Sequence, residues 1–207
     1  MKLFLKENSY DIVKLYITQI GITIFSLIMY TACGMIDGDG GIRSTIEIAI
    51  SVFATLFFYI LLYTAAWDWG AKDKIRVDGG RLVPNKAKAL LMALIAAIPN
   101  LVLSGLAAIS FFFCLVGVTN VFIQIGTVTS VIMRFTSSMY QGLLYNSFQF
   151  MFDTAENAAN FDFYLVQACG YMLMTLLGVL ATHLGYIFGL NDKKIFGFIK
   201  TKPKKYE

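Results

Sequence analysis

A few polar side chains stand out because they lie within long apolar segments of this 207-residue chain. They are Gln19, Asn100, Arg134, Gln167 and Tyr171. Amides and phenol hydroxyls both donate and accept hydrogen bonds, and a guanidinium donates, so these groups could line a hydrated cavity that binds a small solute. The alternative is packing, because polar and small residues also hydrogen-bond neighbouring membrane helices without binding a ligand. Both interpretations stay open, and the five residues form the candidate ligand-binding site.

Catalytic and metal-binding patterns are absent from the sequence. There is no HExxH, GxxxxGK[ST] or nucleophile-elbow motif, and the single histidine, His183, excludes a site built from several histidines. The letters DGDGG at 37–41 begin like a calcium loop, but Ile48 stands where that loop needs a glutamate. The three cysteines form no CxxC pair. We therefore expect a protein that is not an enzyme and that uses no metal ion and no cofactor.

The composition indicates that these residues are held by membrane helices. Hydrophobic residues make up 57% of the chain and charged residues 14%, whereas soluble domains contain about 45–50% and roughly 25%. A helix needs about 20 mainly apolar residues to cross a bilayer, and four segments meet this condition, at about 12–35, 46–67, 88–114 and 163–189. The sequence predicts a single membrane domain, residues 1–207, folded as an all-α integral membrane helical bundle.

The basic residues are concentrated on one side of this predicted bundle. Fifteen of the 17 Lys and Arg residues lie at the N-terminus, in the segment 72–88, or after residue 190. Because short cytoplasmic segments carry the excess of Lys and Arg, we place both termini, the loop 68–87 and the tail 190–207 in the cytoplasm. The expected partner of this basic surface is the anionic inner leaflet of the lipid bilayer rather than nucleic acid.

The two ends of the spans near the cytoplasm carry residues typical of a membrane interface. Trp67 and Trp69 end the second span, and Lys193 and Lys194 follow the last one. Short β-rich runs at 75–77 and 81–83 flank an Asp-Gly-Gly turn, which predicts a small hairpin in the loop. The tail alternates lysine with isoleucine and phenylalanine, so we expect it to lie on the inner leaflet.

Residues 120–149 allow several arrangements. Polar residues recur on one helical face: Asn120, Gln124, Thr127, Arg134, Ser138, Gln141, Tyr145 and Gln149. We favour four transmembrane helices plus one long amphipathic helix at about 120–149, lying along the outer interface or over the bundle, with Arg134 on its solvated face. In the alternative, the helix breaks near residues 136–138 and gives two short crossings, and six transmembrane helices in all. A single buried crossing that carries Arg134 is the third possibility, and it would place the lysine-rich tail outside.

Several segments resemble a recurring type of small polytopic membrane protein from Gram-positive bacteria, whose members are functionally uncharacterised. The similar segments are KENSYDIVKLYITQIGITIF, GAKDKIRVDGGR, RFTSSMYQG and LGYIFGLNDKKIFGF. The resemblance covers most of the chain and implies a multi-pass location in a bacterial plasma membrane. It implies no catalytic residues.

Two functions are consistent with these observations. The first is a non-enzymatic accessory, interaction or immunity-type membrane subunit that contacts a membrane protein partner or forms a homo-oligomer. The second is a small-solute binding or transport component with a polar intramembrane cavity. A wet, closed cavity lined by Gln19, Asn100 and Gln167 would favour the second function, and dry packing there would favour the first.

Overall fold

The computed structural model describes residues 2–35, 40–81, 83, 85–118, 121–151 and 161–193, and all regular elements in these ranges are helical. The elements are α1 (Lys2–Gly34), α2 (Gly40–Asp78), α3 (Lys88–Leu115), α4 (Phe122–Thr136), the short 3-10 helix η1 (Ser138–Tyr140), α5 (Gln141–Met151) and α6 (Phe161–Leu190). The predicted all-α bundle is confirmed.

Four helices, α1, α2, α3 and α6, are long and apolar enough to cross a membrane. Their outward faces carry large apolar side chains, and Ile17, Phe53 and Leu173 are 58–60% exposed. Soluble monomers rarely expose apolar surface on this scale, because its contact with water is unfavourable. The fold is therefore a four-helix bundle that can cross a membrane four times.

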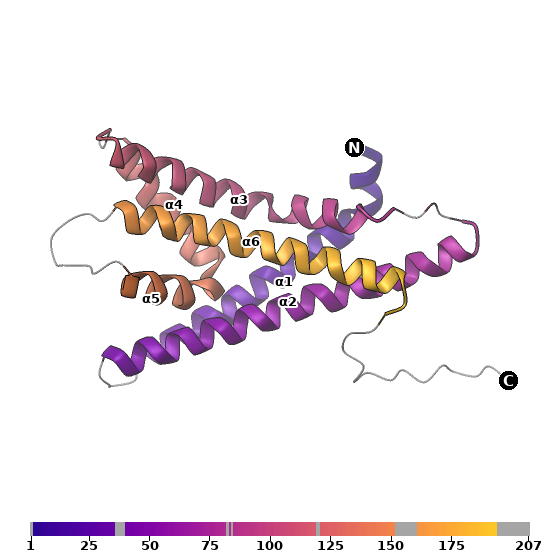
Figure 1. Cartoon of the computed structure of the whole chain (residues 1–207), viewed down its shortest axis with the longest axis horizontal. Coiled ribbons are helices and arrows are strands. Elements are labelled where there is room, and N and C mark those ends of the chain that lie inside the picture. Colours follow the sequence, from indigo (N-terminus) through magenta and orange to yellow (C-terminus); the bar gives the residue numbers. More distant parts are fainter. Residues whose placement is uncertain are drawn as a thin grey trace.

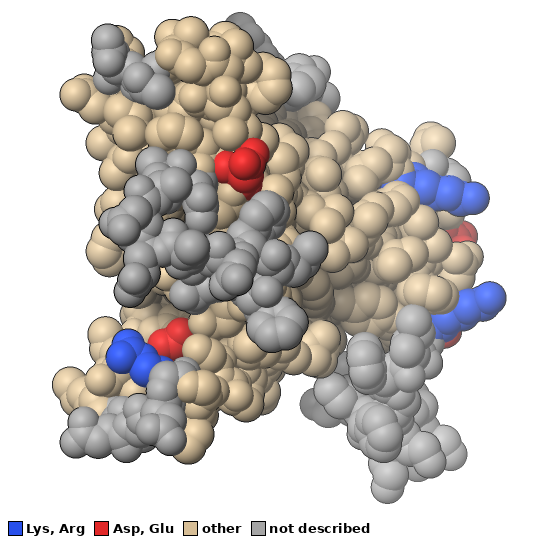
Figure 2. Space-filling view, turned by 60° about the vertical axis from the view of Figure 1, so that its left-hand side comes forward, with Lys and Arg blue, Asp and Glu red and all other residues tan. Residues whose placement is uncertain are grey.

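Helix α6 lies at the centre of the bundle and packs mainly against α2 and α3 (Figure 1). One end of the bundle holds the start of α1, the end of α2, the start of α3 and the end of α6 (right in Figure 1), and we call it the basic end. The other end holds the end of α1, the start of α2, the end of α3 and the start of α6, and we call it the hairpin end. Figure 2 brings the hairpin end forward and shows few charged side chains among its described residues, with further basic side chains at the opposite end.

The segment between α3 and α6 corrects our prediction of one long amphipathic helix. The helix ends at Thr136, and η1 and α5 follow it in a different direction, so that α4 and α5 form a helical hairpin (Figure 1). At a rise of 1.5 Å per residue, α4 is about 22 Å long and α5 about 16 Å, so neither crosses a hydrocarbon core of about 30 Å. The break at 136–138 is the one we considered for six crossings, but among the described residues only four helices are long and apolar enough to cross a membrane.

The segment after Trp67 also differs from our prediction. Helix α2 continues to Asp78, so residues 68–78 are helical and the predicted β-hairpin is wrong. The Asp-Gly-Gly sequence caps this helix instead: Gly80 has a φ of 67°, its N–H donates to Val77 O at 2.9 Å, and the Arg81 N–H donates to Arg76 O at 2.9 Å. This hydrogen-bond pattern is the Schellman motif, which favours glycine because it needs a left-handed residue.

Small residues bring α2 and α6 close together. A Cβ added to Gly185 would collide with the backbone of Tyr63, and one added to Gly189 would collide with the backbone of Trp67. Gly70 of α2 is in turn packed against the backbone of α6. Glycine is needed at these positions because the two helix backbones are in direct contact.

Candidate functional site

The tip of the α4–α5 hairpin lies inside the bundle and is held there by α1. Thr136 O, at the end of α4, accepts hydrogen bonds from Thr23 Oγ1 at 3.0 Å and from Gln19 Nε2 at 3.4 Å. In return, Ser138 Oγ donates to Thr23 O at 2.7 Å. Thr23 is 11 residues before the end of α1, so the tip lies about 16 Å from the hairpin end of that helix, close to the middle of a 30 Å hydrocarbon core.

Helix α2 holds the other side of the tip. Ser51 Oγ and Thr55 Oγ1 both donate to Met139 O. Farther toward the hairpin end, the Gly142 N–H donates to the hydroxyl of Tyr30 at 2.9 Å. A broken helix inside a membrane needs such partners, because an unpaired backbone group in hydrocarbon costs several kcal/mol.

These contacts account for several polar residues of α1. Its residues bind the backbone of the hairpin, so the packing interpretation accounts for Thr23, Tyr30 and much of Gln19. Ser138, which we had placed on a solvated face, is fully buried. The predicted solvated position of this residue is therefore wrong, since the hairpin tip around it meets α1 and α2.

A small central cavity lies between the hairpin tip and the basic end. Gln19 and Asn100 both line it, together with Tyr140, Thr175 and Thr182. Its volume is about 30 Å³, which is room for one or two water molecules. The structure thus brings Gln19 and Asn100 together, as predicted, but the space between them is too small for a solute, and Gln167 does not line it.

The other three candidate residues form a separate group on the far side of the tip. Within the described residues, Arg134 Nε, Gln167 Nε2 and Tyr171 Oη are buried and have no hydrogen-bond partner. Gln167 and Tyr171 are each only 2% exposed and lie one turn apart on the same side of α6. The Tyr171 ring contacts that of Tyr140 at the hairpin tip, with centroids 6.4 Å apart.

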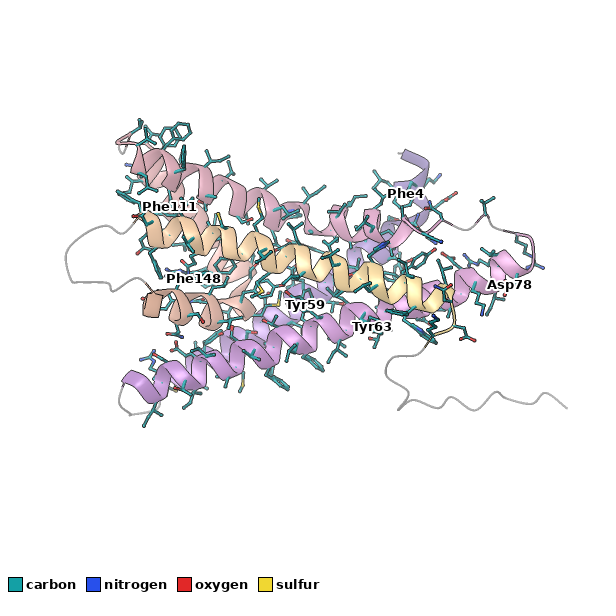
Figure 3. All side chains as sticks on the ribbon, in the orientation of Figure 1. Phe4, Tyr59, Tyr63, Asp78, Phe111 and Phe148 are labelled. Carbon is teal, nitrogen blue, oxygen red and sulfur yellow. The ribbon has the colours of Figure 1, made fainter. Side chains whose placement is uncertain are left out.

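A hollow of about 210 Å³ leads from the hairpin end toward Arg134. Ile123, Thr127, Ser130 and Arg134 line it from one face of α4, with Phe111 of α3 and with Phe161 and Tyr164 of α6. Figure 3 labels Phe111 at this end of the bundle, on the opposite side of α6 from Phe148. Arg134 is the only charged residue among those lining the hollow, and it lies about 18 Å along α4 from its first residue.

The guanidinium of Arg134 has little compensation from the protein. It lies over the ring of Tyr145, with 5.8 Å between Cζ and the ring centroid, and none of the ion pairs between described residues includes it. At the same end, Glu47 is paired with Arg43 at 3.1 Å and accepts a hydrogen bond from Asn146 at 3.2 Å. Arg134 is half-buried and its Nε is buried without a hydrogen-bond partner among the described residues. A partly desolvated cation without a counter-charge is unfavourable, so Arg134 is a candidate ligand contact.

The predicted interface residues have mixed outcomes. The Trp67 indole donates to Lys193 O at 3.0 Å and so fixes the chain after α6. Trp69 is 8% exposed and packs in the core, so it does not face the membrane as predicted. Lys194 and the rest of the tail lie outside the described residues.

A buried ionic cluster at the basic end was not predicted. Asp73 is 2% exposed and accepts hydrogen bonds from Lys88 Nζ at 2.7 Å and from the Tyr186 hydroxyl at 2.9 Å. It therefore joins α2, α3 and α6. The sequence signal is the spacing of Trp69 and Asp73, which continues the buried face of α2 by one further turn.

Comparison of the chain with known protein families, with curated proteins and with solved structures finds no match. The function must therefore be inferred from the site itself.

Proposed function

We propose that this chain is a non-enzymatic, multi-pass membrane protein that binds a small solute at the hairpin end of its bundle. The observation that carries this proposal is the set of three buried polar atoms, Arg134 Nε, Gln167 Nε2 and Tyr171 Oη, that no group of the described residues satisfies. Buried polar groups in proteins are nearly always hydrogen-bonded, and exceptions at a cavity are typical of functional sites.

The shape of the bundle supports binding over conduction in this conformation. The hollow beside Arg134 is about 210 Å³, whereas the cavity between the hairpin tip and the basic end is about 30 Å³. A solute could enter the first space, but only water fits the second. The protein would then act as a receptor or as the binding component of a larger assembly.

The distribution of basic residues supports one orientation of the protein in the membrane. By the positive-inside rule, the basic end faces the cytoplasm of a bacterial plasma membrane and the solute arrives from outside. In a cysteine-free variant, Asn85→Cys should react with an impermeant maleimide only from the cytoplasmic side. Ile42→Cys and Val118→Cys should react only from the outside. Labelling of Val118→Cys from the cytoplasm would contradict the hairpin arrangement.

The binding function is tested by identifying small molecules that remain with the purified protein. Wild type and the variants Gln167→Leu and Tyr171→Phe would be extracted from native membranes and analysed by mass spectrometry. Thr182→Val is a matched control, because Thr182 is also buried on α6 but bonds only within its own helix, to Gly178 O at 2.9 Å. We expect one solute to be enriched with wild type and the control and depleted from the other two variants. Identical extracts from all four proteins would contradict the proposal.

A second candidate function is the interaction subunit suggested by the sequence. Helix α2 extends past the ends of α3 and α6 at the basic end (Figure 1), and Ile75 in this extension is 73% exposed. An exposed isoleucine beside the basic side chains of Lys72 and Arg76 suits a docking contact. A photo-crosslinker at Ile75 should then capture a partner chain, while one at lipid-facing Ile17 should not.

A further inference from the structure

We infer that the solute bound beside Arg134 is an oxyanion, a molecule whose carboxylate or phosphate group meets the guanidinium at the deep end of the hollow. This inference rests on the proposed binding function and specifies its ligand. It depends on three features of the structure: the charge balance of the site, the kinds of hydrogen-bonding atoms that remain free, and the path that leads to them.

The charge balance requires an anion. Arg134 carries a permanent positive charge, and it stands in the hollow without an ion-pair partner among the described residues. No described carboxylate lines the hollow. Contact with the Tyr145 ring compensates the charge in part, but a ring is a weaker partner for a desolvated cation than a counter-ion.

The free hydrogen-bonding atoms are donors. The unsatisfied atoms of Arg134 and Gln167 are N–H groups, and the hydroxyl of Tyr171 can donate as well. A cation or a hydrogen-bond donor in this position would find no carboxylate among the described residues that line the hollow. A carboxylate or phosphate offers several acceptor oxygens, and its geometry matches the planar fork of a guanidinium, which a spherical halide does not.

The path to these atoms is short and partly polar. Thr127, Ser130 and Arg134 follow one another on the face of α4 that lines the hollow. Tyr164, Gln167 and Tyr171 lie on one side of α6, and Tyr164 lines the same hollow. An oxyanion in the hollow would therefore contact Arg134 directly, while the unsatisfied Gln167 amide and Tyr171 hydroxyl, which do not line the hollow, follow Tyr164 along α6.

The test measures binding of defined anions to the full chain in a detergent solution free of lipid and phosphate. Acetate, inorganic phosphate and chloride would be titrated while the unfolding temperature is followed. A short-chain phosphatidylglycerol forms a further arm, because an outer-leaflet lipid could supply the same phosphate chemistry. A response to acetate or inorganic phosphate would identify a free solute, and a response to the lipid alone would identify a headgroup; either result supports the inference.

Variants separate a specific site from a general effect of salt. Loss of a hydrogen bond to a charged group corresponds to about tenfold to hundredfold weaker binding, and this is expected for Arg134→Gln. Tyr171→Phe should weaken binding by about two- to tenfold, which keeps the test valid if Arg134→Gln does not fold. Arg134→Lys should bind more weakly than wild type, since it lacks the fork. Arg43→Gln, which removes an exposed basic residue at the same end, should bind as wild type does.

Two results would overturn the inference, and they differ from failure of the binding function. The first is an equal response of wild type, Arg134→Gln and Tyr171→Phe to every anion, or a response to chloride that matches the response to the oxyanions. The second is the retention of a neutral solute that depends on Gln167 and Tyr171 but not on Arg134. In that case the protein would still bind a solute, and only the oxyanion assignment would be wrong.

Discussion

The hydrogen bonds at the hairpin tip lead to a quantitative prediction about membrane stability. Thr136 O has two donors, Thr23 Oγ1 at 3.0 Å and Gln19 Nε2 at 3.4 Å. Thr23→Val or Gln19→Leu alone leaves one donor in place, so each should lower the free energy of unfolding by about 0.6 kcal/mol, a typical value for a hydrogen bond between membrane helices.

The double variant should lose more than the sum of the single ones. With both donors removed, the carbonyl of Thr136 has no partner, and the full cost of a buried unsatisfied acceptor is about 1–3 kcal/mol. We expect a total loss of about 2–3 kcal/mol and a coupling energy of about 1 kcal/mol, which a double-mutant cycle isolates.

The measurement is reversible unfolding in mixed micelles, followed by circular dichroism. Thr18→Val is the matched control, because Thr18 lies on the same helix and its hydroxyl bonds only to Lys14 O, at 2.9 Å. The control should change stability by less than about 0.5 kcal/mol. Strictly additive losses would contradict the shared acceptor, and a double variant as stable as the control would show that the hairpin tip does not depend on α1.

Two further predictions concern the packing of the bundle. Gly189→Ala should lower the unfolding temperature markedly, because the new Cβ collides with the backbone of α2. Gly21→Ala, where no atom lies near the new Cβ, should be neutral or slightly stabilising. Equal effects of the two substitutions would contradict the close α2–α6 contact. Asp73→Asn should lower the free energy of unfolding by about 1.5–3 kcal/mol, because it removes a buried charge bound to Lys88 and Tyr186. Asp68→Asn, at an exposed ion pair, should lower it by less than about 1 kcal/mol. Chemical unfolding in detergent measures both, and a similar cost for the two aspartates would exclude a structural role for the buried cluster.

The long spans were predictable because each satisfies a simple condition of length and polarity. The ends of these spans were harder to predict, and α2 shows the reason. Asp-Gly-Gly is compatible with a hairpin turn and with a helix cap, and the choice depends on Asp73. Its contacts with Lys88 and Tyr186 hold the additional turns of α2 against α3 and α6. These partners lie 15 and 113 residues away along the chain, and a local pattern contains no information about such distant contacts.

The hairpin could not be predicted for a related reason. A stripe of polar residues looks the same on one long helix and on two short helices that fold back on each other. The choice depends on whether another element can bind the backbone groups that a break exposes. Backbone groups at the break are bound by Thr23 on α1 and by Ser51 and Thr55 on α2. The sequence does not distinguish Ser51 and Thr55, because isolated hydroxyls are common in membrane helices.

Hydrogen bonding within the protein separates the polar residues that build the fold from those that are free to bind a ligand. Thr23, Ser51 and Thr55 bond to the hairpin backbone, so their role is complete without any other molecule. Arg134 and Gln167, on the other side of the hairpin, have buried polar atoms that the described protein does not satisfy. If these atoms also served only the fold, replacing them with apolar groups would stabilise the protein, because their desolvation would no longer be uncompensated. A binding site predicts the opposite in the presence of its ligand: the wild type should gain stability with ligand concentration, and the apolar variant should not.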